Sequence, residues 1–134
     1  MVQIICSGST TSAPVGSFKS PALTSLSPFT AKTALAESIL MALQETKRPK
    51  ALIARSVHPD YRQVAQTYLS GTSYEAKEIP FADGFGVDLD YLKKNLNQEI
   101  ACVVVASPNF FGLIEDLTEV EKLVHQNGSL LILV

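Results

Sequence analysis

The residues best suited to bind a ligand lie in two short loops, and each loop follows an apolar run. The first loop, Arg55-Ser56-Val57-His58-Pro59, follows residues 51–54, and the second, residues 106–112, follows residues 100–105. Arg55 could hold a carboxylate or a phosphate in a bidentate fork, and His58 could stack on a cofactor or bond to a substrate carboxylate. In the second loop, Asn109 precedes Phe110 and Phe111.

Each of these side chains also has a purely structural interpretation. Phe110 and Phe111 could wall a ring-shaped ligand, and they could equally anchor a subunit interface. His58 stands directly before Pro59, so it could simply cap a helix, and Arg55 could belong to a structural ion pair. The sequence alone leaves both interpretations open.

A third candidate lies where residues 29–33 lead into a helix. Backbone amides at a helix N-terminus attract phosphate, and Thr33 could add a hydroxyl or Lys32 a charge. The nucleotide-site motifs GxxxxGK[ST] and GxGxxG are absent from the sequence. We therefore favour simple N-capping by Thr30.

The sequence offers no catalytic residue and no metal site. It contains no defensible nucleophile-plus-base pair or paired carboxylates, and Cys6 and Cys102 are far apart without a CxxC motif. Glu115 and Asp116 are adjacent, and we expect them in the first turn of a helix, where acidic side chains suit the helix dipole.

Composition limits the class of protein. At 134 residues the chain forms one domain at most, and a net charge of -2 with scattered basic residues argues against nucleic-acid binding. No run of 18 apolar residues exists, so we expect no membrane span. Two distant cysteines are typical of a reducing, cytoplasmic compartment.

The pattern from residue 30 onward predicts alternating helices and strands. Helices are expected at 31–46, 59–69, 88–96 and 117–126, and strands at 51–54, 74–79, 100–105 and 129–134, with a turn at 83–86. Strands that alternate with helices indicate an α/β fold with a mostly parallel sheet and helices on both faces. The two candidate loops then share the carboxyl edge of the sheet, where such sheets bind ligands.

The two ends of the chain differ from this regular pattern. Residues 1–29 are rich in Ser, Thr and Pro and contain no acidic residue, and only residues 1–6 resemble a strand. We expect residues 1–29 to form a poorly ordered or atypical tail and residues 30–134 to form the domain. A transit peptide is disfavoured because no arginine precedes Arg48. The final run, 129–134, has the composition of a central, fully buried strand, so we expect the chain to be cut off inside a larger domain.

Three segments together resemble a known family. They are residues 33–42 (TALAESILMA), residues 55–64 (RSVHPDYRQV) and residues 108–116 (PNFFGLIED). In this order they resemble the pyridoxal-phosphate-dependent glycine decarboxylase, the P-protein of the glycine cleavage system, and its subunit 1 in particular. The resemblance covers roughly residues 27–134.

The resemblance implies part of the large domain of a fold-type-I pyridoxal-phosphate enzyme. It implies that the cofactor is pyridoxal phosphate, that glycine is decarboxylated, and that the aminomethyl group passes to the lipoylated H-protein. The Schiff-base lysine is expected on a partner, glycine dehydrogenase subunit 2. His58, Arg55, Asn109, Phe110, Phe111 and Thr33 would then lie near the cofactor or the subunit interface, and the chain alone would be inactive.

Two other functions stay open. The first is a truncated, non-catalytic binding or interface module, in which exposed Phe110 and Phe111 would cause aggregation. The second is a flavodoxin-like regulator, which would place a flavin-phosphate loop at Ser7-Gly8-Ser9-Thr10-Thr11.

Overall fold

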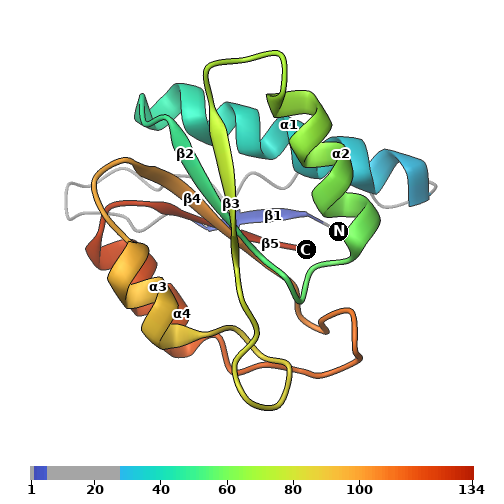
Figure 1. Ribbon diagram of the computed structural model, residues 1–134, viewed down its shortest axis with the longest axis vertical. Helices are drawn as coiled ribbons and strands as arrows, with labels where there is room; N and C mark the ends of the chain where they lie inside the picture. Colours follow the sequence, from blue (N-terminus) through green and yellow to red (C-terminus); the bar gives the residue numbers. More distant parts are fainter. Residues whose placement is uncertain (1, 6–27) are drawn as a thin grey trace.

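The protein is a three-layer α/β structure built around one sheet (Figure 1). The computed structural model describes residues 2–5 and 28–134. The elements in chain order are β1 (Gln3–Ile5), α1 (Pro28–Thr46), β2 (Lys50–Ala54), α2 (Pro59–Leu69), β3 (Glu75–Ile79), α3 (Leu89–Asn95), β4 (Ile100–Val105), α4 (Thr118–Gln126) and β5 (Leu130–Leu133). The sheet order is β1-β5-β4-β2-β3.

Strands β2 to β5 are parallel to one another, and β1 is antiparallel to β5. Helices α1 and α2 lie on one face of the sheet and α3 and α4 on the other (Figure 1). The predicted fold class, a mostly parallel sheet with helices on both faces, is therefore confirmed. Strand β3 lies at one edge of the sheet.

The core follows directly from the hydrophobic pattern. All six residues of β4 are buried, as a strand covered on both faces requires. Leu35, Ile39 and Leu43 repeat at four-residue spacing along α1 and are fully buried. This spacing places one apolar stripe of the helix against the sheet.

The structure corrects two predicted helix starts and the predicted full burial of the last strand. Helix α1 begins at Pro28, so Thr30 lies inside the first turn and is not the N-cap; proline is well tolerated in that turn, which explains the earlier start. Helix α4 begins at Thr118, beyond Glu115 and Asp116. In β5, Leu130 and Leu133 are only partly buried, because they lie at the two ends of a short strand.

Only part of the N-terminal segment lies within the described residues, so only some of its predictions can be compared with the structure. Gln3–Ile5 forms β1, whereas Cys6 and the Ser7–Thr11 loop lie outside the described residues, and the division of the chain at residue 29 stays a prediction. Because β1 is antiparallel to β5, the carboxyl end of β1 lies at the end of the sheet away from the two candidate loops. This placement disfavours a flavodoxin-like site after the first strand.

Within residues 2–5 and 28–134, no helix combines the length and apolar character needed to cross a membrane. The same residues contain no group of three or more His, Cys, Asp or Glu side chains that could hold a metal ion.

Candidate functional site

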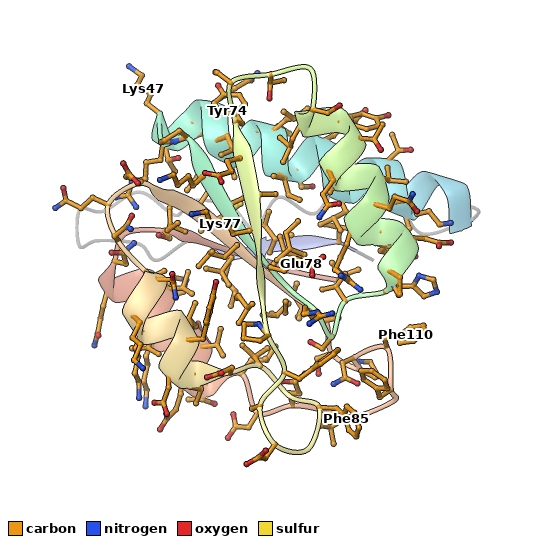
Figure 2. All side chains as sticks on the ribbon, viewed as in Figure 1. Lys47, Tyr74, Lys77, Glu78, Phe85 and Phe110 are labelled. Carbon is orange, nitrogen blue, oxygen red and sulfur yellow. The ribbon has the colours of Figure 1, made fainter. Side chains whose placement is uncertain are left out.

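Three loops meet at the carboxyl edge of the parallel strands. The backbone amide of Phe110 donates to the carbonyl oxygen of Ser56 at 2.8 Å, which joins the loops that follow β4 and β2. The loop after β3 is the third, and it was absent from the sequence-based site. Figure 2 shows Phe85 and Phe110 together at this end, with Lys47 and Tyr74 at the other.

At the carboxyl ends of the neighbouring strands β2 and β4, the chain leaves the sheet toward opposite faces. Strand β2 continues into α2 on one face, and β4 leads to α4 on the other face (Figure 1). Open α/β sheets bind ligands at such a switch point. The hydrogen bond between Phe110 and Ser56 joins the loops that follow these two strands, so the predicted loops meet where the fold favours ligand binding.

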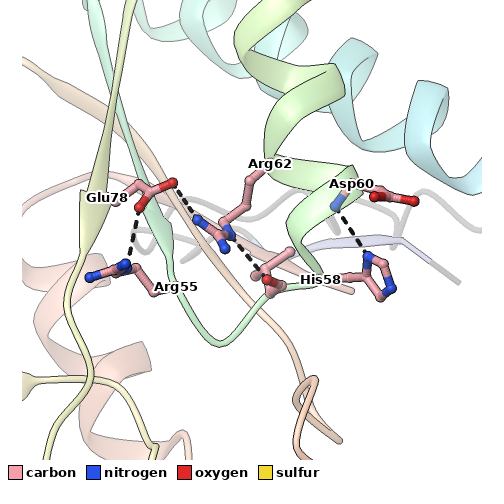
Figure 3. A network of polar contacts seen from close by, with 6 residues as sticks. Arg55, His58, Asp60, Arg62 and Glu78 are labelled. Atoms are coloured by element: carbon pink, nitrogen blue, oxygen red, sulfur yellow. Dashed lines mark hydrogen bonds and ion pairs between the residues drawn. The ribbon is translucent and has the colours of Figure 1, made fainter.

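His58 caps α2, as one of its two interpretations predicts. Its Nδ1 accepts a hydrogen bond from the backbone amide of Asp60 at 3.2 Å (Figure 3). The imidazole also lies edge-on to Phe110, with ring centroids 4.8 Å apart, and 5.6 Å from the ring of Tyr61. The cap therefore fixes the imidazole beside the second loop.

Arg55 takes part in a small ion-pair network that is centred on Glu78 of β3. Its Nε lies 3.4 Å from Oε2 of Glu78, and Arg62 donates to Oε1 of the same carboxylate (Figure 3). Arg62 also donates through Nε to the carbonyl of Val57 at 3.1 Å. The guanidinium of Arg55 is half exposed and lies 5.5 Å from the ring centroid of Phe81. The structural ion pair is confirmed, and an anion-binding role of Arg55 stays a prediction.

We expect Glu78→Gln to lower the free energy of unfolding by about 1–2 kcal/mol, since two guanidiniums lose their shared carboxylate and Arg62 is mostly buried. Chemical denaturation measures this change. Glu75→Gln is the matched control, because Glu75 is exposed on the same strand and lies 3.9 Å from Lys77. Equal effects of the two substitutions would contradict the network's importance.

Asn109 is the buried organiser of the second loop. Its Oδ1 accepts hydrogen bonds from the amides of Phe111 at 3.0 Å and Leu113 at 3.1 Å. Its Nδ2 donates to the carbonyl of Phe85 at 3.1 Å and to Oε1 of Glu115 at 2.9 Å. One side chain thus shapes its own loop and joins it to the loop after β3. Its role near a ligand stays a prediction.

Glu115 corrects the interpretation of the acidic pair. The sequence placed it in the first turn of a helix, but α4 begins at Thr118, and Glu115 bridges the two loops instead. Its Oε2 accepts from the amide of Val87 at 2.8 Å, while Oε1 accepts from Asn109. A Cβ at Gly86 would lie 3.1 Å from Oε2, so this close approach favours glycine there. Glu115 is a site-organising residue that sequence reasoning missed.

Asp116 behaves more nearly as expected. Its Oδ1 accepts a hydrogen bond from the amide of Thr118 at 3.0 Å, at the start of α4. The hydrogen bonds from the Thr118 side chain and backbone lower the pKa of the Asp116 carboxyl. Asp116 therefore supports the helix start, whereas Glu115 does not.

Four phenylalanines form what we call the aromatic cluster: Phe81, Phe85, Phe110 and Phe111. The ring of Phe111 lies 4.8 Å from that of Phe85, 5.4 Å from that of Phe81 and 5.5 Å from that of Phe110, measured between centroids. Phe85, Phe110 and Phe111 are each about half exposed. These rings present an apolar surface at the carboxyl edge.

Phe85, one member of the aromatic cluster, has a strained backbone conformation. Its φ of 66° lies in the left-handed region, which is rare for a bulky residue. Its amide donates to the carbonyl of Ala82 at 3.1 Å, and its carbonyl accepts from Asn109. The turn at 83–86 was predicted, and its position after a third strand was the signal that could have added Phe81 and Phe85 to the site.

Thr33 lies on α1, which packs against α2. The neighbouring Lys32 places its Nζ 2.8 Å from Oδ2 of Asp60, near the start of α2. This pairing lowers the pKa of the Asp60 carboxyl. A phosphate-binding role of Thr33 stays a prediction.

Comparison with known proteins identifies the family. A family model described as "Glycine cleavage system P-protein" matches residues 22–134. The protein named probable glycine dehydrogenase (decarboxylating) subunit 1 of Geobacillus thermodenitrificans is 48% identical over 100 residues, which is 75% of this chain and 22% of that relative. The protein of the same name from Listeria innocua is 50% identical over 100 residues, which is again 75% of this chain and 22% of that relative.

Solved structures agree with this result. A crystal structure of glycine decarboxylase (P-protein) in inhibitor-bound form matches with a TM-score of 0.66 and 37% identity, over 73% of this chain and 21% of that chain. A PLP-bound C-S lyase from Staphylococcus hominis has a TM-score of 0.57 at 16% identity, over 74% of this chain and 26% of that chain, which shows the fold alone. The chain spans about a fifth of its curated relatives, and it belongs to the glycine cleavage system P-protein family.

Proposed function

We propose that this chain supplies one part of subunit 1 of a glycine dehydrogenase (decarboxylating), an oxidoreductase of glycine catabolism. Family membership and the names of the relatives support this proposal. The matched part spans only 22% of the Geobacillus thermodenitrificans relative. Activity therefore requires further polypeptide, and we propose that it takes place in the cytoplasm.

Pyridoxal phosphate is the cofactor that we propose for the assembled enzyme, but the described residues do not form a complete site for it. A Schiff base needs a lysine amine inside the pocket. Among residues 28–134, Lys32, Lys50 and Lys77 pair with carboxylates, and Lys47, Lys93, Lys94 and Lys122 are exposed on turns or helices. The resemblance to the P-protein family implies that this lysine belongs to subunit 2, and we propose that it comes from there.

The aromatic cluster is the observation that carries the proposal. It lies at the carboxyl edge where this fold binds ligands, and Asn109 and Glu115 hold its two loops together. Half-exposed phenylalanines are suited to pack against a partner or against a ring-shaped ligand. We propose that this surface, with His58 and Arg55 beside it, borders the cleft shared with subunit 2, where glycine and the lipoylated H-protein react.

We expect the isolated chain to catalyse no glycine–bicarbonate exchange, because it lacks a cofactor lysine among its described residues. The assay mixes pure chain with pyridoxal phosphate and lipoylated H-protein and follows incorporation of labelled bicarbonate. Activity above that of the mixture without the chain would overturn the proposal.

A chimera tests the role of the aromatic cluster. The matched 100 residues of the Geobacillus thermodenitrificans subunit are replaced by those of this chain, and exchange is measured with subunit 2 and H-protein. We expect the chimera to be active, and Phe110→Ala with Phe111→Ala to reduce its rate at least tenfold. Tyr68→Ala is the control, because Tyr68 is similarly exposed but lies on α2. An equal loss with Tyr68→Ala would contradict the assignment.

A non-catalytic interface module is the second candidate function. The exposure of Ile114, 77%, next to the half-exposed phenylalanines favours it. An apolar surface of this kind marks an interaction site or an aggregation risk. This candidate predicts an inactive chimera, with concentration-dependent self-association of the isolated chain that Phe110→Ala and Phe111→Ala relieve.

A further inference from the structure

Two arginines share a single carboxylate beside the candidate site. Figure 3 shows the guanidiniums of Arg55 and Arg62 on either side of the carboxylate of Glu78. Within the part of the chain that the structure describes, neither guanidinium forms an ion pair with another carboxylate. Two positive charges therefore meet one negative charge, and the network keeps one positive charge that is not balanced.

The unbalanced charge belongs to Arg55. Arg62 is mostly buried, donates to Oε1 of Glu78 and donates through Nε to the carbonyl of Val57 at 3.1 Å. Arg55 is half exposed, and its Nε lies 3.4 Å from Oε2 of Glu78, which is long for a charge-assisted hydrogen bond. A mostly buried guanidinium needs its counter-charge more than an exposed one does, so Glu78 mainly neutralises Arg62. Arg55 keeps donors that can hold a second carboxylate.

The neighbouring acidic side chains do not supply that second carboxylate. Asp60 pairs with Lys32 at 2.8 Å, and Glu115 accepts hydrogen bonds from the two loops that it joins. Asp83 is exposed in the turn of the third loop, and it forms no ion pair with Arg55. The second carboxylate would therefore come from outside the described residues.

Arg55 adjoins the aromatic cluster. Its Cζ lies 5.5 Å from the ring centroid of Phe81, and the ring of Phe81 lies 5.4 Å from that of Phe111. Phe111 and Phe85 are about half exposed. A cation beside exposed rings is suited to an apolar group that carries a carboxylate, because the rings pack against the apolar part and the guanidinium can bind the carboxylate through two hydrogen bonds.

We infer that Arg55 and the aromatic cluster form a docking site for an acidic side chain of subunit 2 that stands beside an apolar one. The inference rests on the proposed function, because it assumes assembly with that subunit. Charge complementarity selects the partner, since its carboxylate supplies the negative charge that the network of Arg55, Arg62 and Glu78 lacks. Because Arg55 is half exposed, its pairing with subunit 2 depends on salt.

Binding of the chimera to subunit 2 tests this inference, measured at about 0.05 M and about 0.5 M NaCl. We expect Arg55→Gln to weaken binding at least about fivefold at low salt and to reduce its salt dependence. Arg55→Lys keeps the charge without the planar fork, so we expect a smaller loss. Lys77→Gln is the matched control, because Lys77 is about half exposed at the centre of β3, away from the aromatic cluster (Figure 2). No effect of Arg55→Gln, or an equal effect of Lys77→Gln, would overturn the inference.

A small probe tests the same chemistry on the isolated chain. Phenylacetate joins a ring to a carboxylate, and phenylacetamide is its uncharged analogue. In an NMR titration we expect phenylacetate to bind at least about fivefold more tightly than phenylacetamide, and Arg55→Gln to remove this preference. This variant keeps the pair of Arg62 with Glu78, so we expect it to fold. Equal binding of the two compounds, or a preference that persists in Arg55→Gln, would overturn the inference. A chimera that fails to bind subunit 2 would contradict the proposed function, because phenylacetate binding is measured without that subunit.

Discussion

Replacing Asn109 with alanine is expected to lower the free energy of unfolding by about 3 kcal/mol, with loss of order in both aromatic loops. The substitution removes four hydrogen bonds, to the amides of Phe111 and Leu113, the carbonyl of Phe85 and the carboxylate of Glu115. Partly buried groups that lose a partner cost about 1–3 kcal/mol each, and solvent recovers some of this. Chemical denaturation followed by circular dichroism measures the total change.

The Asn109→Asp variant separates the roles of the two ends of the amide. It keeps the Oδ1 acceptor for both loop amides, but it places a carboxylate 2.9 Å from Oε1 of Glu115 in place of a donor. We expect this variant to be destabilised at pH 7 and to recover part of the loss at pH 4.5, where one of the two carboxyls can carry a proton. A variant that is equally unstable at both pH values would show that repulsion at Glu115 is unimportant.

Asn97→Ala is the matched control for the loss of an amide. Asn97 is exposed, and its Oδ1 accepts one hydrogen bond from the amide of Glu99. We expect a change within about 0.5–1 kcal/mol. A loss at Asn97 as large as that at Asn109 would contradict the organising role that we assign to Asn109.

The second large effect is a loss of stability in alkali that depends on Cys102. Burial in β4 raises the pKa of the Cys102 thiol to about 12. The pKa of a cysteine thiol in the unfolded chain is about 8.5, so the unfolded state releases its proton first as the pH rises. The contribution of Cys102 to the free energy of unfolding is therefore fully present below about pH 8.5 and falls by about 1.4 kcal/mol per pH unit above it, to a loss of about 2.7 kcal/mol by roughly pH 10.5.

Cys102→Ala isolates this contribution, because all other titrating groups stay the same. We expect the variant to be less stable at pH 7, since it loses buried sulfur, and the gap between the two proteins to narrow or reverse by about pH 10.5. Denaturant unfolding across this pH range measures the gap. A constant gap would mean that Cys102 ionises equally in both states. Native Cys102 should also resist thiol reagents, because the thiolate is the reactive form.

Most of the fold was predictable because its signals are local. The apolar run in β4, Pro59 at the start of α2 and Asp88 at the start of α3 each fix an element through neighbouring residues. The Oδ1 of Asp88 accepts from the amide of Tyr91 at 2.9 Å, as an N-cap requires. Strand and helix alternation then limited the topology to a parallel sheet.

The candidate site was predictable only in part. Chain order indicated that the loops after β2 and β4 share an edge, and the bond from Phe110 to Ser56 confirms that these loops meet. The interpretation of Glu115 was wrong, because helix-dipole reasoning considers only the nearest turn. Its true partner, the amide of Val87, lies 28 residues away.

The sequence by itself determined the family, the order of elements and the two loops that follow β2 and β4, since periodicity, turn residues and motifs are properties of short segments. Only the tertiary structure decided three things: that Phe81 and Phe85 join Phe111, that Asn109 and Glu115 connect their loops, and that β1 covers the edge of β5. These contacts join residues far apart in the chain. Long-range contacts depend on how the layers pack, so no local pattern encodes them.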